Sequence, residues 1–464
     1  MNDSIRLYDR VLRSLFVALA VGLGWGIRGD LGHELGAAYP GAALGLAFAY
    51  VSGQASMFKW MPYLGAAGAL GISLGGMMSY GILHGYAQSD TFLNYSYGFF
   101  TLLLEGGAWG CGGGVLIGLL LEKQRLRVSE CLSLAATTLL IGALFYYLIV
   151  HLIGFHINPP RNDLSIGFTG GVLGLLAWLI DRKKWYATKG AVLGFVGFGI
   201  GMALGRLLGN ASTLQPLAVN HWNIMECSVG FIGGFIFTFG MLGKEVAPPP
   251  DDRDFRFVGL LSCFGVMAIP LFHLLGRIEI QKKLGGWSAA LAGYGYANPD
   301  ERAQNVLRLI LAVCAVGLVA AYVWSLFWRA DKTSRSAFPV LILSLLMILF
   351  QNLNALYFWY PRQPNTINMH FMFWIFLALM LLYAMLRRHE PAVVPDEKAD
   401  HINWFRYIGG TIAAYLVIIY IAGFVNGPTT MPSANTRWPV WVWKDGPFPR
   451  DQEVKIDLFS RWRN

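Results

Sequence analysis

Apolar segments long enough to cross a lipid bilayer recur from one end of this chain to the other, and this pattern restricts the fold more than any other feature. Of the 464 residues, 55% are hydrophobic and only 14% are charged, and the mean hydropathy is +0.48. In soluble domains roughly a quarter of the residues are charged. The sequence therefore predicts an all-α, polytopic membrane protein without a sizeable soluble domain.

The apolar segments number about thirteen when charged and proline-rich stretches are taken as their ends. We expect transmembrane helices near 11–27, 36–56, 63–83, 98–121, 132–156, 164–180, 190–208, 223–243, 257–276, 305–328, 338–358, 369–386 and 404–425.

Lysine and arginine gather in every second loop, for example at Arg6, Arg10 and Arg13 and again at 182–189. By the positive-inside rule these loops face the cytoplasm, so the N-terminus is expected inside and the C-terminus outside. The formal net charge of +9 then follows from topology, and no nucleic-acid partner is expected. We expect a multi-pass protein of the inner (plasma) membrane of the cell, with the lipid bilayer as a partner.

The cysteines and the Gly-x-Gly stretches do not indicate a cofactor. The five cysteines lie in or beside the apolar segments, without the spacing of a disulfide framework or a zinc site. The Gly-x-Gly stretches at 22–24 and 199–201 lie inside expected spans with no preceding strand, so they do not predict a dinucleotide site. We expect no cofactor and no metal, although a metal site assembled from different parts of the chain remains an alternative.

An internal repeat is visible in the first half of the chain. Four times an acidic residue is followed seven residues later by a glycine and then by a second small residue. The four acids are Glu34, Glu105, Asp163 and Glu226, and the glycines are Gly41, Gly112, Gly170 and Gly233. A period of roughly 60 to 70 residues predicts four stacked copies of one helical hairpin.

Composition changes at the proline-rich stretch 248–250 and divides the chain into regions. We expect residues 1–244 to form a glycine-rich bundle of four hairpin repeats with about eight transmembrane helices, because glycine lets helices approach closely in lipid. Residues 257–425 are expected to form an aromatic- and leucine-rich bundle of about five helices. Residues 426–464 are expected to form an external tail.

The repeated acids have a structural and a functional interpretation. Glu34, Asp163 and Glu226 are expected to open inward-running helices, where a carboxylate caps the helix and complements its dipole. Glu105 follows six apolar or weakly polar residues and is expected within the membrane, where an ionisable side chain is a functional candidate by default. Its expected partners are Arg28 and Arg206. In the structural interpretation, such an Arg–Glu pair only holds two hairpins together.

If the four hairpins pack around one axis, their polar ends converge on one externally facing pocket. The expected lining is Arg28, His33, Glu34, His84, Glu105, His156, Arg161, Asp163, Arg206, His221 and Glu226. Guanidinium groups bind carboxylates, sulfates and phosphates, so this mixture suits a small polar or anionic solute. Acidic and histidine side chains together are equally suited to carrying protons.

Two functional classes follow from this pocket. The first is a transporter or permease whose solute enters from outside and binds at polar helix ends. The second is a membrane-embedded transferase or hydrolase that acts at the external face on a lipid-linked or glycan substrate. Glu34 or Asp30 would serve as the base, with His33 or His221 assisting and Arg28 or Arg206 binding a phosphate. A structural subunit of a membrane complex is a third alternative, and a homo-oligomer is left open.

Overall fold

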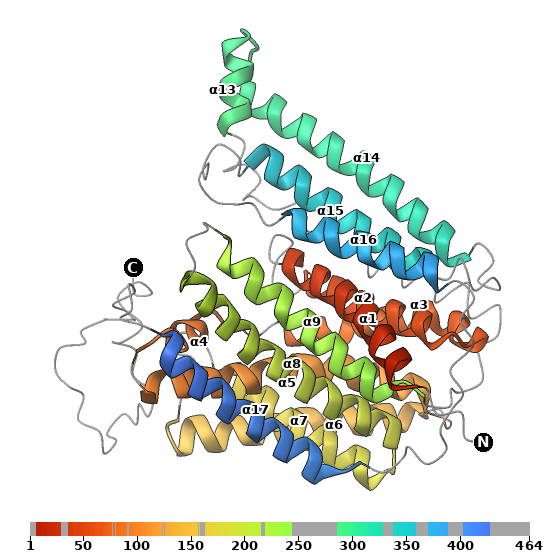
Figure 1. Ribbon diagram of the computed structural model, residues 1–464, viewed down its shortest axis with the longest axis vertical. Coiled ribbons are helices and arrows are strands. Elements are labelled where there is room, and N and C mark those ends of the chain that lie inside the picture. The colour runs from red at the N-terminus through yellow and green to blue at the C-terminus, as the bar shows by residue number, and fades with distance from the viewer. Residues whose placement is uncertain are drawn as a thin grey trace, which may run out of the picture.

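The computed structural model describes residues 6–28, 36–76, 78, 80–90, 92–122, 124, 126–155, 157, 163–214, 219–243, 285–327, 337–358, 370–387 and 402–426. Apart from turns and short connections, these residues are helical (Figure 1). The elements are α1 (Leu7–Arg28), α2 (Ala38–Ser52), α3 (Ala55–Gly75), α4 (Gly81–Tyr86), α5 (Phe92–Leu121), α6 (Val128–Tyr146), η2 (Tyr147–Leu152), α7 (Leu164–Asp181), α8 (Trp185–Ala211), η3 (Ser212–Leu214), α9 (His221–Met241), α13 (Gly285–Gly293), α14 (Pro299–Phe327), α15 (Phe338–Phe358), α16 (His370–Leu386) and α17 (Trp404–Val425).

Within the described residues, seven helical segments are long and apolar enough to cross a membrane. They are Leu7–Arg28, Asn94–Leu121, Val128–Leu152, Leu164–Asp181, Trp185–Leu214, His221–Met241 and Trp404–Val425. Two shorter apolar helical segments, Phe338–Ile348 and Phe371–Leu386, accompany them. The chain is therefore an α-helical protein with several helices suited to a membrane, while the number of thirteen spans and their orientation remain predictions.

Two of the expected spans differ from the helices in the structure or lie beyond them. The segment expected at 63–83 is wrong in its boundaries, because α3 covers Ala55–Gly75 and the short helix α4 follows after a break. Consecutive glycines, Gly75 and Gly76, mark the end of α3, and glycine weakens a helix through the backbone entropy that it loses. The span expected at 257–276 lies outside the described residues.

Six helices of the first half form a closed ring. Taken in the order α1, α2, α3, α5, α8 and α9, each packs against the next, and α9 returns to α1. Large aromatic side chains fill the space enclosed by these six helices. The aromatic centroids of Trp25 and Trp109 are 5.4 Å apart, and those of Trp25 and Phe198 are 5.2 Å apart. All three side chains are fully buried.

Glycine allows these helices to approach closely, as expected. Where α5 meets α8, Gly110 faces Gly194 and Gly114 faces Gly190, and a Cβ at any of the four positions would collide with the backbone of the facing helix. Such small-residue contacts replace the hydrophobic effect as the source of helix association in lipid. Backbone contact over several turns therefore holds α5 against α8.

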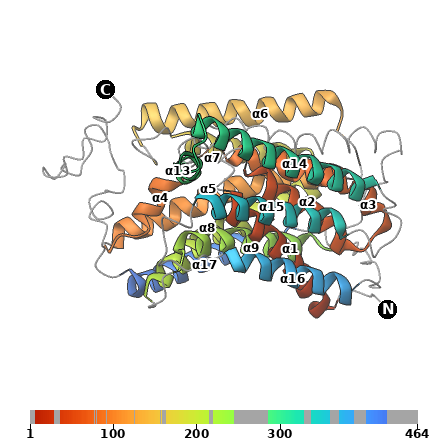
Figure 2. The ribbon, with the colours of Figure 1, turned by 90° about the horizontal axis from the view of Figure 1, so that it is seen from above.

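Most of the remaining helices lie outside the ring, with α13 to α16 toward the top of Figure 1 and α6, α7 and α17 toward the bottom (Figures 1 and 2). The helices α6 and α7 pair with each other, and α6 lies at an edge of the structure in both views. Helices α15 and α16 pack against α1, whereas α17 packs against α8 and α5. The α6–α7 pair thus lies outside the ring. The internal repeat and the division into regions remain predictions.

Candidate functional site

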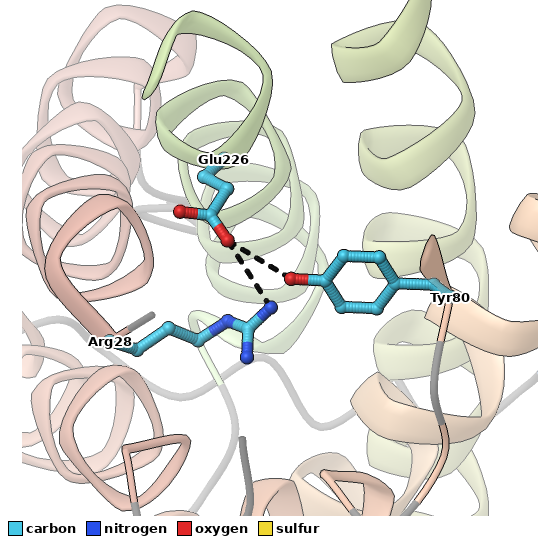
Figure 3. A network of polar contacts seen from close by, with 3 residues as sticks. All are labelled: Arg28, Tyr80 and Glu226. Atoms are coloured by element: carbon cyan, nitrogen blue, oxygen red, sulfur yellow. Dashed lines mark hydrogen bonds and ion pairs between the residues drawn. The ribbon is translucent and has the colours of Figure 1, made fainter. Parts of the chain in front are cut away.

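Two charged side chains meet at the end of the ring where α1 finishes. Arg28 is the last residue of α1, and Glu226 lies one turn inside α9; their relative exposures are 0% and 2%. The Nη2 atom of Arg28 is 3.4 Å from Oε1 of Glu226. The hydroxyl of Tyr80 donates a hydrogen bond of 3.0 Å to the same carboxylate oxygen (Figure 3).

Aromatic rings surround the guanidinium of Arg28. Its Cζ atom lies 4.8 Å from the ring centroid of Trp109, 5.0 Å from that of Tyr80 and 5.3 Å from that of Trp25. A guanidinium within about 6 Å of a ring centroid is attracted by the negative face of the ring. The rings therefore stabilise the buried positive charge, but they do not supply hydrogen-bond acceptors.

Several N–H groups at this site have no acceptor among the described residues. They are Nε and Nη1 of Arg28 and the indole Nε1 atoms of Trp25 and Trp109, all of them buried. Nearly all buried polar groups in native proteins are hydrogen-bonded, and leaving one unsatisfied costs about 1–3 kcal/mol. A cluster of such donors calls for an explanation, and a bound ligand with acceptor oxygens is one.

His84 lies next to this cluster and is also buried, with a relative exposure of 1%. Its ring centroid is 4.9 Å from that of Tyr80 and 5.2 Å from that of Trp222. Neither ring nitrogen has a hydrogen-bond partner within the part of the chain that the structure describes. Burial, together with the positive charges of Arg206 and Arg28, holds the pKa of His84 well below its usual value. The imidazole is therefore neutral at physiological pH.

Glu105 is buried inside α5, within a segment suited to span a membrane, as the sequence predicts. Its carboxylate acts electrostatically on Arg28. We call the group formed by Trp25, Arg28, Tyr80, His84, Glu105, Trp109, Trp222 and Glu226 the Arg28 site. Trp222 is 41% exposed, so the aromatic series of this site runs from the buried guanidinium to the surface.

Arg206 and His221, two further predicted site residues, belong to a neighbouring network. Arg206 donates from Nε to Oδ1 of Asn210 at 2.6 Å. Asn210 in turn donates to the carbonyl of Ala87 at 3.0 Å and to Oδ1 of Asn426 at 2.8 Å. His221 Nδ1 lies 2.6 Å from Oγ of Ser212. The hydrogen bonds of Asn210 connect α8 to the residues after α4 and to the end of α17, and the contact between Ser212 and His221 connects η3 to the start of α9.

Asp163 forms a hydrogen bond that stabilises the connection between η2 and α7. Its Oδ1 accepts a hydrogen bond of 2.8 Å from the backbone N–H of Ile157, whose carbonyl accepts one of 3.2 Å from the hydroxyl of Tyr97. Asp163 occupies the N-cap position of α7, but its side chain makes no capping hydrogen bond. The capping interpretation is therefore wrong for Asp163.

The capping interpretation is also wrong for Glu226. The N-cap of α9 is Asn220, whose side chain accepts from the backbone N–H groups of Trp222 and Asn223. Glu226 lies more than one turn further along α9 and pairs with Arg28, so it belongs to the Arg28 site.

The other predicted residues lie outside the described ranges. These are Asp30, His33, Glu34, His156 and Arg161. Among the residues that the structure does describe, no three His, Cys, Asp or Glu side chains group closely enough to hold a metal ion.

Sequence reasoning missed the aromatic members of the site, although a spacing pattern was available to find them. Four polar residues of the site each have an aromatic residue one helical turn away in sequence: Trp25 with Arg28, Tyr80 with His84, Glu105 with Trp109, and Trp222 with Glu226. Residues three or four apart are neighbours on a helix surface. A search for aromatic residues at that spacing from a charged residue or a histidine would have found all four pairs.

Comparison with known proteins leaves the site as the main guide to function. No protein-family model, no curated protein and no solved structure matches this chain.

Proposed function

We propose that this chain is a membrane transporter that binds a small polar solute with a negatively charged group, such as a carboxylate, at the Arg28 site. One observation carries the proposal: the buried guanidinium of Arg28 and the indoles of Trp25 and Trp109 have N–H groups without acceptors among the described residues. Arginine and tryptophan side chains offer only donors, so a ligand that binds these three side chains supplies acceptor oxygens. Arginine is well suited to this because its planar fork matches carboxylate geometry.

The surroundings of the site favour transport. Charged side chains inside membrane-spanning segments are rare, and they commonly mark the route of a solute or ion. Arg28 and Glu226 lie on two such segments, α1 and α9, and Glu105 lies on a third, α5. A site built between several spanning helices suits a solute that passes through the bundle.

Polar groups at the opposite end of α1 add support, because a transported solute needs an exit as well as an entrance. Arg13 is buried there, with a relative exposure of 4%, and its Nη1 donates to the carbonyl of Val51. Near it, Nη1 of Arg387, the residue that follows α16, lies 2.9 Å from Oδ1 of Asp9. One helix, α1, thus carries a buried cation at each end of the bundle.

The experiment is a thermal-shift screen of the detergent-purified full chain against carboxylates, sulfonates, sulfate, phosphate, amino acids and neutral sugars. A ligand that binds only the folded state raises the melting temperature. The comparison protein is the double variant Arg28→Gln/Glu226→Gln, which removes both members of the ion pair, so that neither of the two is left as a buried charge without the other. We expect an anionic solute to stabilise the wild type by several degrees and the double variant much less.

The fate of the bound compound distinguishes the two functional classes. A transporter returns its solute chemically unchanged, whereas a transferase or hydrolase converts it, which mass spectrometry detects. If no anion stabilises the wild type, or if the double variant responds equally, the proposed site is wrong.

A further inference from the structure

His84 is the buried titratable group that the proposed binding of an anion leaves without a role. It lies in α4 and contacts the aromatic rings of Tyr80 and Trp222, and its two ring nitrogens have no hydrogen-bond partner among the described residues. A neutral imidazole has one donor and one acceptor, and both are normally satisfied when buried. The position of His84 is therefore costly unless one of its nitrogens is used during function.

The charges around His84 come from several helices. Arg28 at the end of α1 and Arg206 on α8 both act on it, and each disfavours a proton on the ring. Glu226 on α9 is connected to it through Tyr80, which donates to the carboxylate and contacts the imidazole edge-on. Glu105 on α5 acts on Arg28.

The charges of these described side chains balance when all of them are ionised. Arg28 and Arg206 contribute two positive charges, and Glu105 and Glu226 contribute two negative ones. An anion placed against Arg28 would leave one negative charge uncompensated in a buried, poorly solvated environment. Such a charge is costly unless it is paired.

We infer that His84 takes up a proton when an anion binds at the Arg28 site, so that the solute and the proton bind together and are carried together. This inference rests on the proposed function. The proton comes from the aqueous phase and binds the ring nitrogen that is not already protonated. The resulting imidazolium restores the charge balance, and its second N–H adds a donor beside a site whose ligand supplies acceptors.

Reciprocity makes the inference measurable. If the anion raises the affinity of His84 for a proton, the proton must raise the affinity of the site for the anion by the same factor. Because one proton is involved, the dissociation constant should rise by up to about tenfold for each pH unit of alkalinisation. A site without linked protonation binds a fully ionised anion equally well at every pH at which the protein stays folded.

The test uses acetate as the probe, because acetate stays ionised between about pH 6 and about pH 8. Titration calorimetry on the full-length protein gives the dissociation constant at each pH, and two buffers of different ionisation heat give the number of protons taken up. We expect tighter binding at the acidic end and uptake of up to about one proton per acetate in the wild type. His84→Gln should still bind acetate, without the pH dependence and without proton uptake.

A second histidine provides the matched control. His221 is only partly buried and lies near Arg206, but its Nδ1 is engaged with Ser212. His221→Gln should retain both the pH dependence and the proton uptake. Loss of proton uptake in His221→Gln, or its persistence in His84→Gln, would overturn the assignment to His84.

Failure of this inference differs from failure of the proposed function. Acetate binding that needs Arg28 but does not vary with pH refutes the proton coupling and leaves the anion site intact. If acetate does not bind the wild type at any pH, the anion site is refuted and the coupling with it.

Discussion

Nη2 of Arg28 and Oε1 of Glu226 lie 3.4 Å apart although 198 positions separate the two residues in sequence. The pair joins the last residue of α1 to the first turns of α9 and is closed off from solvent on both sides. Three aromatic rings around the guanidinium complete the enclosure. The first and last helices of the ring are thus connected by a buried ion pair at the centre of the proposed site.

This pair leads to a prediction about stability. Arg28→Gln leaves the carboxylate of Glu226 buried without its cation, and breaking one side of a buried pair costs about 3–5 kcal/mol. The double variant Arg28→Gln/Glu226→Gln removes both charges, so its melting temperature should lie clearly above that of Arg28→Gln. Thermal unfolding of the three proteins in the same detergent measures the order. If the double variant melts no higher than Arg28→Gln, the two side chains do not act as a pair.

His84 leads to a prediction about pH. Its pKa is lowered in the folded protein by burial and by the charges of Arg206 and Arg28, whereas in the unfolded chain it returns to about 6.5. As pH falls through that unfolded value, the unfolded chain gains a proton that the folded protein does not accept, so stability decreases. The melting temperature of the wild type should therefore drop between about pH 7 and about pH 5.5, and His84→Gln should lose part of this drop. Equal drops in the two proteins would contradict this prediction.

The Trp109→Phe variant tests whether the buried N–H groups without acceptors bind a ligand. Trp109→Phe keeps an aromatic ring beside Arg28 but removes a buried indole N–H that has no acceptor among the described residues. Removing an unsatisfied donor offsets part of the packing that a smaller ring loses, so we expect stability within about 2 kcal/mol of the wild type. Stabilisation by the anion should decrease at the same time. A variant that binds the anion as tightly as the wild type would exclude a role for this N–H.

The glycine contacts lead to a prediction about packing that is independent of function. Gly110→Ala places a methyl group against the backbone of Gly194, where no flexible side chain can move away, so we expect a loss of about 1–3 kcal/mol. Gly409 in α17 is the matched control, because a Cβ there meets no atom within 4 Å. Gly409→Ala should leave the melting temperature unchanged or raise it slightly. Similar behaviour of the two variants would mean that α5 and α8 do not pack through their glycines.

Local patterns in the sequence predicted part of this architecture. Hydropathy identified most of the helices, since long apolar runs such as α6 and α17 need no tertiary information. Glycine content indicated close helix packing, and the position of Glu105 within an apolar run indicated a buried carboxylate. The closed ring could not be predicted, because it depends on which helices meet across long sequence separations, as α1 and α9 do.

The site was predicted less completely than the fold. The sequence singled out Arg28, His84, Glu105 and Glu226, which the structure brings together. It expected Asp163 in the same pocket, but this residue braces the connection before α7. An acid repeated at a fixed spacing records a local pattern, whereas the partner of each acid is determined by helix packing. Thus Glu226 forms an ion pair with the guanidinium of Arg28, whereas Asp163 accepts a hydrogen bond from the backbone N–H of Ile157.

The most direct test of the account is solute uptake by the purified protein reconstituted into sealed vesicles. The solute is a radiolabelled anion that stabilises the wild type in the thermal-shift screen, and the Arg28→Gln/Glu226→Gln variant is measured in parallel. We expect the wild type to move the unchanged anion across the membrane, faster when the outside is more acidic than the inside, and the variant to give only the background leak. An anion that binds at Arg28 but never crosses the membrane, or that crosses equally fast in the variant, would contradict a transporter built around this site.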